Sequence, residues 1–144
     1  MSRFNENNVK ELKEFLYDSC IHDAKLENII YKCMEDSIEI ELFNPILNVK
    51  IDLTFKNILI VLAIKGGGYG SRETIISLTA EEDFSSLQTY LPKYNECIGS
   101  VYLLFQMFSG DELHIVSKEV IIQKTGADRR KTQRRGDGTV CYND

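Results

Sequence analysis

Two stretches of this 144-residue sequence alternate strictly between apolar and polar residues, and this alternation restricts the fold more than any other feature. The first covers residues 38–42 and the second covers residues 49–55. Successive side chains of a strand point to opposite faces of a sheet, so each stretch predicts a strand with one buried and one solvated face. Asn44-Pro45 lies between them and predicts the turn of a hairpin.

Further strands are predicted on both sides of this hairpin. A β-prone segment over residues 24–31 precedes it, and residues 58–64 follow it as an unbroken run of apolar, mostly branched side chains. A run without alternation predicts a central strand that is buried on both faces. Residues 73–78 predict another strand, and residues 98–108 and 113–123 predict the two strands of a second hairpin.

Helical spacing occurs in two places. The first helix begins at Asn8, which with Glu11 forms an approximate capping box, and it ends near residues 17–19, where short polar side chains compete for backbone hydrogen bonds. A second, short helix is predicted from a capping box at residues 79–82 to about Tyr90. The apolar stripe of the first helix consists of Val9, Leu12, Phe15, Leu16 and Cys20.

These elements predict an α+β fold. Its centre is a curled, mainly antiparallel sheet of about seven strands, with an N-terminal helix on the apolar face and one short inserted helix. Because several strands have a solvated face, the sheet is expected to be strongly curled or half-open. The length allows one domain.

The charge divides the chain into an acidic body and a basic end. Residues 124–144 hold six basic and three acidic residues, a net charge of +3, so residues 1–123 carry −8 of the total of −5. We expect residues 1–123 to form the single domain and residues 124–144 to be a disordered tail. An acidic body repels phosphate and suits a basic protein partner. Nucleic-acid binding is not expected despite the basic run at residues 129–135, which lacks aromatic residues for base stacking.

No feature of the sequence predicts a membrane, a metal or a cofactor. The N-terminus has no apolar signal segment, and the longest apolar run, residues 58–64, has the length of a strand. The chain is therefore expected to be cytoplasmic. The cysteines do not follow the spacing of a zinc site; they are Cys20, Cys33, Cys97 and Cys141.

A glycine cluster over residues 66–70 follows the apolar run and raises the question of a phosphate loop. It lacks the lysine-serine step of a Walker loop, and the segment after it predicts a strand instead of a helix. A hairpin loop that uses positive φ angles is the favoured interpretation. Tyr69 and Arg72 are candidates for contacting a partner from this loop.

Two histidines are candidates for acid–base chemistry. His22 is flanked by Asp18 and Asp23, although in a strand His22 and Asp23 would point to opposite faces. His114 alternates with apolar neighbours and would face away from both of them. The favoured interpretation is that both histidines are structural or lie at the surface.

The acidic run Glu81-Glu82-Asp83 coincides with the predicted start of the short helix. Carboxylates at a helix N-terminus interact favourably with the helix dipole. The same three side chains are candidates for contacts with a basic partner.

Two short motifs resemble those of a group of small bacterial proteins. The first is residues 15–21, followed by residues 26–29, and it is similar to an F/L-H-D-[S/A/C]-x-[I/V] signature; Tyr17 stands where the group usually has histidine. The second is Phe55-Lys56-Asn57-Ile58, an "F-x-N-[V/I]" step. Most such proteins are uncharacterised, and some are assigned as immunity proteins of bacterial toxin systems. The resemblance implies a protein that neutralises one toxin without a cofactor.

These observations favour a non-catalytic cytoplasmic binding protein, similar to an immunity protein, whose partner is a basic protein such as a cognate toxin. One alternative is a carrier whose sheet encloses a small ligand, suggested by the aromatic strand over residues 102–108. A less favoured alternative is a hydrolase-type enzyme that uses His22 and Asp18. The candidate binding residues are Asp18, His22, Asp23, Tyr69, Arg72, Glu81, Glu82 and Asp83.

Overall fold

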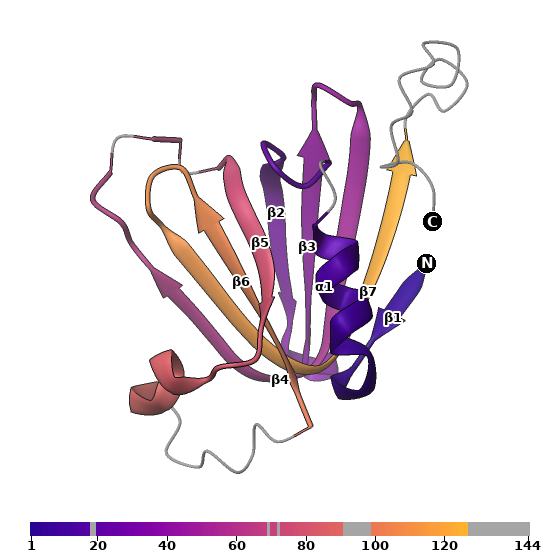
Figure 1. The fold of residues 1–144 in the computed structure, drawn as a ribbon, viewed down its shortest axis with the longest axis vertical. Coiled ribbons are helices and arrows are strands. Elements are labelled where there is room, and N and C mark those ends of the chain that lie inside the picture. The colour runs from indigo at the N-terminus through magenta and orange to yellow at the C-terminus, as the bar shows by residue number, and fades with distance from the viewer. Residues whose placement is uncertain (18–19, 69, 72, 91–98, 127–144) are drawn as a thin grey trace.

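The computed structural model describes residues 1–17, 20–68, 70–71, 73–90 and 99–126 (Figure 1). The described part holds seven strands, one α-helix and three short 3-10 helices. In chain order they are β1 (Ser2–Phe4), η1 (Glu6–Asn8), α1 (Val9–Leu16), β2 (Lys25–Lys32), η2 (Cys33–Glu35), β3 (Ser37–Asn44), β4 (Val49–Ile64), β5 (Ile75–Glu81), η3 (Ser85–Tyr90), β6 (Val101–Met107) and β7 (Glu112–Gly126).

The strands form one antiparallel sheet with α1 packed on one face, which confirms the predicted fold class (Figure 1). The order is β2-β3-β4-β7-β6-β5, and β1 pairs with residues 120–122 of β7 on the side of that strand away from β4. The two expected hairpins are present, β3 with β4 and β6 with β7. Strand β1 was not predicted, because three residues are too few to show a period.

The sheet is half-open and not strongly curled, but its two ends meet at one point. A single bridge joins Lys25 of β2 to Thr74, just before β5. Backbone hydrogen bonds on either side support it: Ile75 N donates to Ala24 O over 2.8 Å, and Asp23 N donates to Ile75 O over 3.0 Å. This junction fixes the turn after α1 against the start of β5.

The predicted strands at residues 49–55 and 58–64 are one strand, β4, with an irregularity between them. Asn57 has a positive φ of 58°, and the register with β7 shifts between Ile58 and Ile60. The prediction that residues 58–64 are buried on both faces is wrong: Val61 is 46% exposed and Ile64 is 41% exposed. The run extends beyond β3, so only β7 pairs with it among the described strands.

Two apolar clusters stabilise the sheet, one on each face. The main core lies on the α1 face and includes Leu12 and Leu16 of the helix with Leu53 and Phe55 of β4. The second cluster lies on the opposite face and is centred on Leu87, Tyr102 and Val116. Half-buried side chains around it are Leu59, Ile60, Leu62, Phe84 and Leu104.

The N-terminal helix is present but is capped differently from the prediction. The Asn8 side chain does not cap α1; instead Asn5 and Asn8 form a reciprocal capping box around the preceding 3-10 turn. The Asn5 side chain accepts from Asn7 N over 2.8 Å, and the Asn8 side chain accepts from Asn5 N over 2.7 Å. The tight turn between β1 and α1 therefore needs both asparagines.

Strand β7 continues past the domain boundary predicted at Gln123. Lys124, Thr125 and Gly126 pair with the start of β4. Lys124 is buried, and its Nζ lies 4.2 Å from the centre of the Phe15 ring, a cation–π contact that joins the sheet to α1. Residues 127–144, the remainder of the predicted tail, lie outside the described residues.

Candidate functional site

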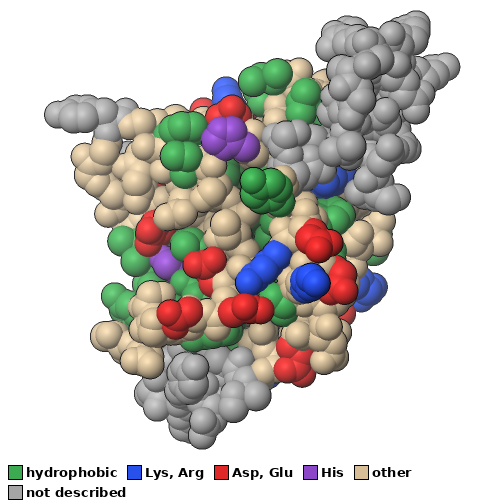
Figure 2. All heavy atoms as spheres, in the orientation of Figure 1, with side chains coloured by type: hydrophobic (Ala, Val, Ile, Leu, Met, Phe, Trp, Pro, Cys, Tyr) green, Lys and Arg blue, Asp and Glu red, His purple; other side chains and the backbone are tan. Residues whose placement is uncertain are grey.

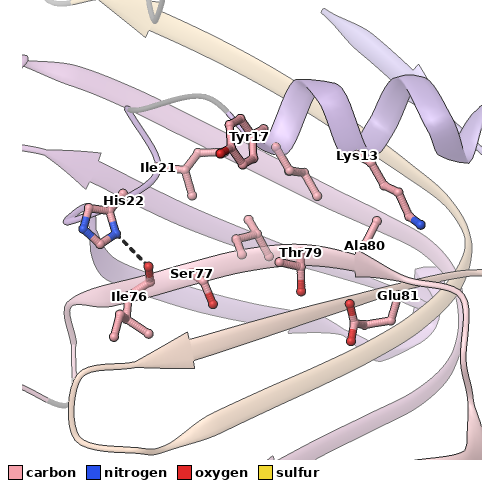
Figure 3. A pocket seen from close by; sticks show the side chains of 11 residues that line it. Lys13, Tyr17, Ile21, His22, Ile76, Ser77, Thr79, Ala80 and Glu81 are labelled. Carbon is pink, nitrogen blue, oxygen red and sulfur yellow. Dashed lines mark hydrogen bonds between the residues drawn. The ribbon is translucent and has the colours of Figure 1, made fainter.

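A groove runs between α1 and the outer edge of β5 (Figure 3). Its volume is about 510 Å³. Its apolar floor comes from the end of α1, the following turn and the core side of β5, and its ionisable groups lie near the two ends. The lining residues are Lys13, Leu16, Tyr17, Ile21, His22, Ile76, Ser77, Leu78, Thr79, Ala80 and Glu81.

The local sequence of β5 explains why this edge forms one wall of the groove. Leu78 and Ala80 point into the main core beneath α1, and Thr79 points away from the core and is exposed. Beyond Ile76, no strand of the described part pairs with β5 on the side that faces α1. The groove therefore offers an unpaired strand edge beside apolar side chains.

His22, a predicted site residue, lies at one end of the groove (Figure 3). Its Nδ1 lies 2.7 Å from the carbonyl oxygen of Ile76, so Nδ1 carries the proton and donates it in this bond. Asp23 Oδ1 lies 3.6 Å from the other ring nitrogen, an ion pair only when His22 is protonated. The expectation that these two side chains diverge is wrong, because the residues form a turn, with Asp23 at a φ of 68°, and not a strand.

The acidic run lies at the other end of the groove, but it does not begin a helix there. Glu81 is the last residue of β5 and lines the groove, and Glu82 Oε2 lies 3.1 Å from Lys13 Nζ of α1. The predicted capping box at residues 79–82 is wrong because Thr79, Ala80 and Glu81 continue the β5–β6 ladder. The following helix is the 3-10 turn η3.

Asp83 performs the capping role that was predicted for its neighbours. Its Oδ1 accepts a hydrogen bond from Ser85 N over 2.9 Å. The backbone bond from Ser85, with a contribution from the Ser85 side chain, lowers the pKa of the Asp83 carboxyl below its ordinary value. Asp83 is therefore a structural residue of the segment that follows the groove.

Carboxylates outnumber cations around the groove. Exposed Glu11 and Glu14 lie on α1, and exposed Glu82 follows β5, whereas the exposed cations of the helix are Lys10 and Lys13. In the space-filling view, acidic side chains surround a few basic ones on the face of the molecule that carries α1 (Figure 2). The exposed charged groups that α1 and Glu82 place here therefore carry a net negative charge.

The glycine loop has a structural explanation other than the predicted one. Of the described loop glycines, none has a positive φ. A Cβ added at Gly66, Gly68 or Gly70 would lie 2.3–2.5 Å from backbone atoms of residues 108–110, so these glycines allow the loop to pack closely against that turn. Gly68 N donates to Ser109 O and Gly66 N to the Asp111 side chain, which uses the amides that a phosphate would need.

A hydrogen-bonded chain of four side chains lies on the opposite face of the sheet from the groove, and the sequence analysis missed it. Glu112 Oε1 accepts from His114 Nε2 over 3.0 Å, which leaves Nδ1 as the acceptor for the Tyr102 hydroxyl. The Ser86 hydroxyl lies 3.3 Å from that of Tyr102. His114 faces away from both of its neighbours, as predicted, but is buried in the second cluster. Burial is the main reason that the pKa of Tyr102 is raised.

The structure brings only some of the predicted site residues together. His22 and Glu81 line the groove, and Asp23 and Glu82 lie beside it. Asp18, Tyr69 and Arg72 lie outside the described residues. The lining residues Lys13, Tyr17, Ser77 and Thr79 were not predicted to share a site, because α1 and β5 meet only in the folded chain.

The described residues form neither a metal-binding cluster nor a membrane-spanning helix. No group of three or more His, Cys, Asp or Glu side chains in that part is placed to hold a metal ion. No helix in it has the length and apolar character to span a bilayer.

The comparisons with known proteins give a structural similarity and no family. No protein-family model matches the sequence, and no curated protein matches it either. Among solved structures, the chain is similar to an uncharacterized protein from Neisseria gonorrhoeae, with a TM-score of 0.49 and 9% sequence identity. The match covers 85% of this chain and 98% of that one.

Proposed function

We propose that this protein is a non-catalytic binding protein that holds a basic protein partner at the groove between α1 and β5. The observation that carries the proposal is the unpaired edge of β5, which lies beside apolar side chains and ends at the carboxylates of Glu81 and Glu82. Extended segments of partner proteins bind to such edges through main-chain hydrogen bonds, and neighbouring pockets select their side chains.

The charges at the groove favour a basic partner. The Lys13–Glu82 pair is largely exposed, with side-chain exposures of 43% and 70%, so breaking it costs little. A lysine or arginine of a partner can replace Lys13 beside Glu82 and also reach Glu81. Leu16 and Ile21 are buried residues of the groove floor and offer the apolar contacts that a basic segment alone would lack.

The surroundings of His22 weigh against a hydrolase. A general base needs a free ring nitrogen directed at its substrate, with the other nitrogen oriented by a partner. In His22, the Ile76 carbonyl orients Nδ1 and leaves Nε2 free, as a base requires, but the ring is more than half exposed to water and Nε2 lies 3.6 Å from Asp23 Oδ1, not directed at a substrate site. This arrangement supports a role in fixing the end of the groove.

The motif resemblance to immunity proteins indicates what the partner would be. An immunity protein neutralises a toxin by covering its active site or a neighbouring surface. An acidic surface suits this task where the toxin carries a basic surface. We therefore propose a toxin with a basic contact surface as the partner.

Co-expression with the product of the gene immediately upstream tests this proposal. We expect the chain to restore growth of cells that make that product, and the purified proteins to form a complex. The double variant Glu81→Lys/Glu82→Lys should weaken the complex about tenfold or more, equivalent to roughly 1.4 kcal/mol. Glu35→Lys is the matched control, because Glu35 is exposed on η2, away from the groove. Cell death despite co-expression, or equal effects of the two changes, would contradict the proposal.

A small apolar ligand is the second candidate occupant of the same groove. The volume of about 510 Å³ lies within the range of ligand pockets, roughly 300–1,000 Å³. The aromatic strand that first suggested a carrier does not contribute: Tyr102 and Phe105 fill the two apolar clusters. Titration with the dye ANS distinguishes the candidates. Strong fluorescence that Thr79→Arg abolishes would favour a ligand, and fluorescence unchanged by that substitution would exclude the groove as its site.

A further inference from the structure

The second half of β4 is an unpaired edge of the sheet. Strand β3 pairs with β4 only as far as Lys56, and β7 pairs with the opposite side of β4 as far as Ile64. The carbonyl oxygen of Asp36 accepts from the amides of Asn57 and Ile58. From Leu59 to Ile64, no strand within the described ranges pairs with the side of β4 away from β7.

This edge lacks the features that normally prevent strand edges from pairing with other chains. Proteins protect such edges with charged residues, prolines or short length. Between Lys56 and Lys65, β4 has no charged residue and no proline. Apolar side chains project from both faces of this segment, with Val61 46% exposed and Ile64 41% exposed.

The outer edges of β2 and β5 differ from this edge. Strand β2 carries Lys25, Glu27 and Lys32 along its length. The outer edge of β5 is unpaired beyond Ile76, but it lines the groove beside α1 and ends at Glu81. Of these three edges, the β4 edge is the one with neither a charged residue along its unpaired part nor α1 beside it.

We propose that residues 58–64 pair with the same residues of a second copy of this chain, forming a symmetric dimer with a continuous sheet. A two-fold axis places identical strands antiparallel to each other, which is the pairing found throughout this sheet. Val61, at the middle of the segment, lies at the axis. The exposed hydrogen-bonding groups of each copy then satisfy those of the other.

The charges at the two ends of the segment permit a second copy to approach. Lys56 lies directly across from Glu119 in the β4–β7 register, and Lys65 Nζ lies 3.9 Å from Asp111 Oδ2. Glu119 also pairs with Arg3, so the Lys65 end is the one that its own carboxylate neutralises. With the axis at Val61, every residue that the second copy places opposite positions 58–64 is uncharged. In a symmetric pair centred on β2, by contrast, Lys25 of one copy would lie opposite Lys32 of the other.

The second apolar cluster would also gain from this contact. Leu59, Ile60 and Leu62 are half-buried members of its border, on the opposite face of the sheet from α1. In the dimer the borders of the two clusters adjoin across the axis. The groove between α1 and β5 takes no part in this contact, so the dimer is independent of the function proposed above.

Sedimentation analysis over a wide concentration range tests the dimer. We expect wild-type protein to have twice the chain mass of 16.5 kDa at high concentration and Val61→Lys to have the single-chain mass. Ile29→Lys is the matched control, since Ile29 has the same exposure of 46% but lies on β2, and it should remain dimeric. Ile64→Lys, at the strand end, is the second variant if Val61→Lys does not fold.

Hydrogen exchange provides a second measurement on the wild-type chain. The alternate amides of residues 59–64 that point away from β7 should become more protected as concentration rises, and those of β2 should not change. A wild-type chain that stays monomeric at every concentration would overturn the proposal. A dimer that survives both lysine variants, or that Ile29→Lys also dissociates, would overturn it as well.

Discussion

Residues 49–55 and residues 58–64 belong to one strand and share β7 as a neighbour, yet their burial differs. In the first half, the apolar side chains are buried, and Leu53 and Phe55 have no exposed surface. The second half is more apolar in sequence and less buried in the structure, with Val61 46% exposed. The difference follows from the neighbours: the first half lies between β3 and β7, and the second half has β7 on one side only.

The hydropathy pattern of a strand indicates what surrounds each of its two faces. Alternation in the first half reports one apolar face and one solvated face, and both are present. Continuous apolar character in the second half reports that each face touches an apolar cluster: Ile58 packs against the main core and Leu59 against the second cluster. Hydropathy carries no information about whether another strand lies beside the segment.

The largest expected difference between the two halves of β4 is in how much the free energy of unfolding falls when a leucine side chain is shortened to alanine. Leu53→Ala should lower the free energy of unfolding by about 2–5 kcal/mol, because it leaves a cavity in the main core. Leu62→Ala should cost less than half as much, since Leu62 is only half-buried and water can fill the space. Urea denaturation at low protein concentration measures both. Equal losses would mean that the second half is as well packed as the first.

The fold could be predicted to the extent that it depends on local patterns. The alternating residues of β3 and β4, and the apolar stripe of α1, have periods that a short window shows. The edge position of residues 58–64 depends on the sheet order, which brings β7 between β4 and β6. No local pattern in the sequence indicates the order of the strands in the sheet.

The candidate site could be predicted only in part for the same reason. His22 and Glu81 were identified by their chemistry, but their common groove arises from the packing of α1 against β5 and the junction at Thr74. The pair of Tyr102 and His114 could be found from the sequence only with the register of the β6–β7 hairpin, in which His114 lies opposite Leu104, two residues from Tyr102.

A smaller loss of stability is expected when the hydrogen bond between Tyr102 and His114, beside the second cluster, is removed. Tyr102→Phe keeps the ring but leaves His114 Nδ1 without its donor in a buried site, so it should cost about 1–3 kcal/mol. Ser86→Ala is the control, because Ser86 is exposed and water replaces its hydroxyl. Thermal unfolding compares the two variants. A loss from Ser86→Ala as large as that from Tyr102→Phe would place the stabilising contact at η3 instead.

The smallest expected effect concerns Asp52, on the solvated face of the first half of β4. Burial raises the pKa of Asp52 above its ordinary value, and Glu41 and Glu39 add to this, while Lys50 opposes it. The folded state therefore binds a proton more tightly than the unfolded state. Stability from this group is complete below the unfolded pKa, about pH 4, and declines as the pH rises through the folded pKa.

Asp52→Asn should therefore raise the free energy of unfolding slightly at neutral pH and have no such benefit below about pH 4. Asp83 provides a comparison of opposite sign, because the Ser85 hydrogen bonds lower its pKa and stabilise the ionised form. Asp83→Asn should lower the unfolding free energy at neutral pH, and its effect should vanish in acid. Urea denaturation of both variants across this pH range measures the two effects. A destabilised Asp52→Asn protein at neutral pH would show that the ion pair with Lys50 outweighs the burial of the carboxylate.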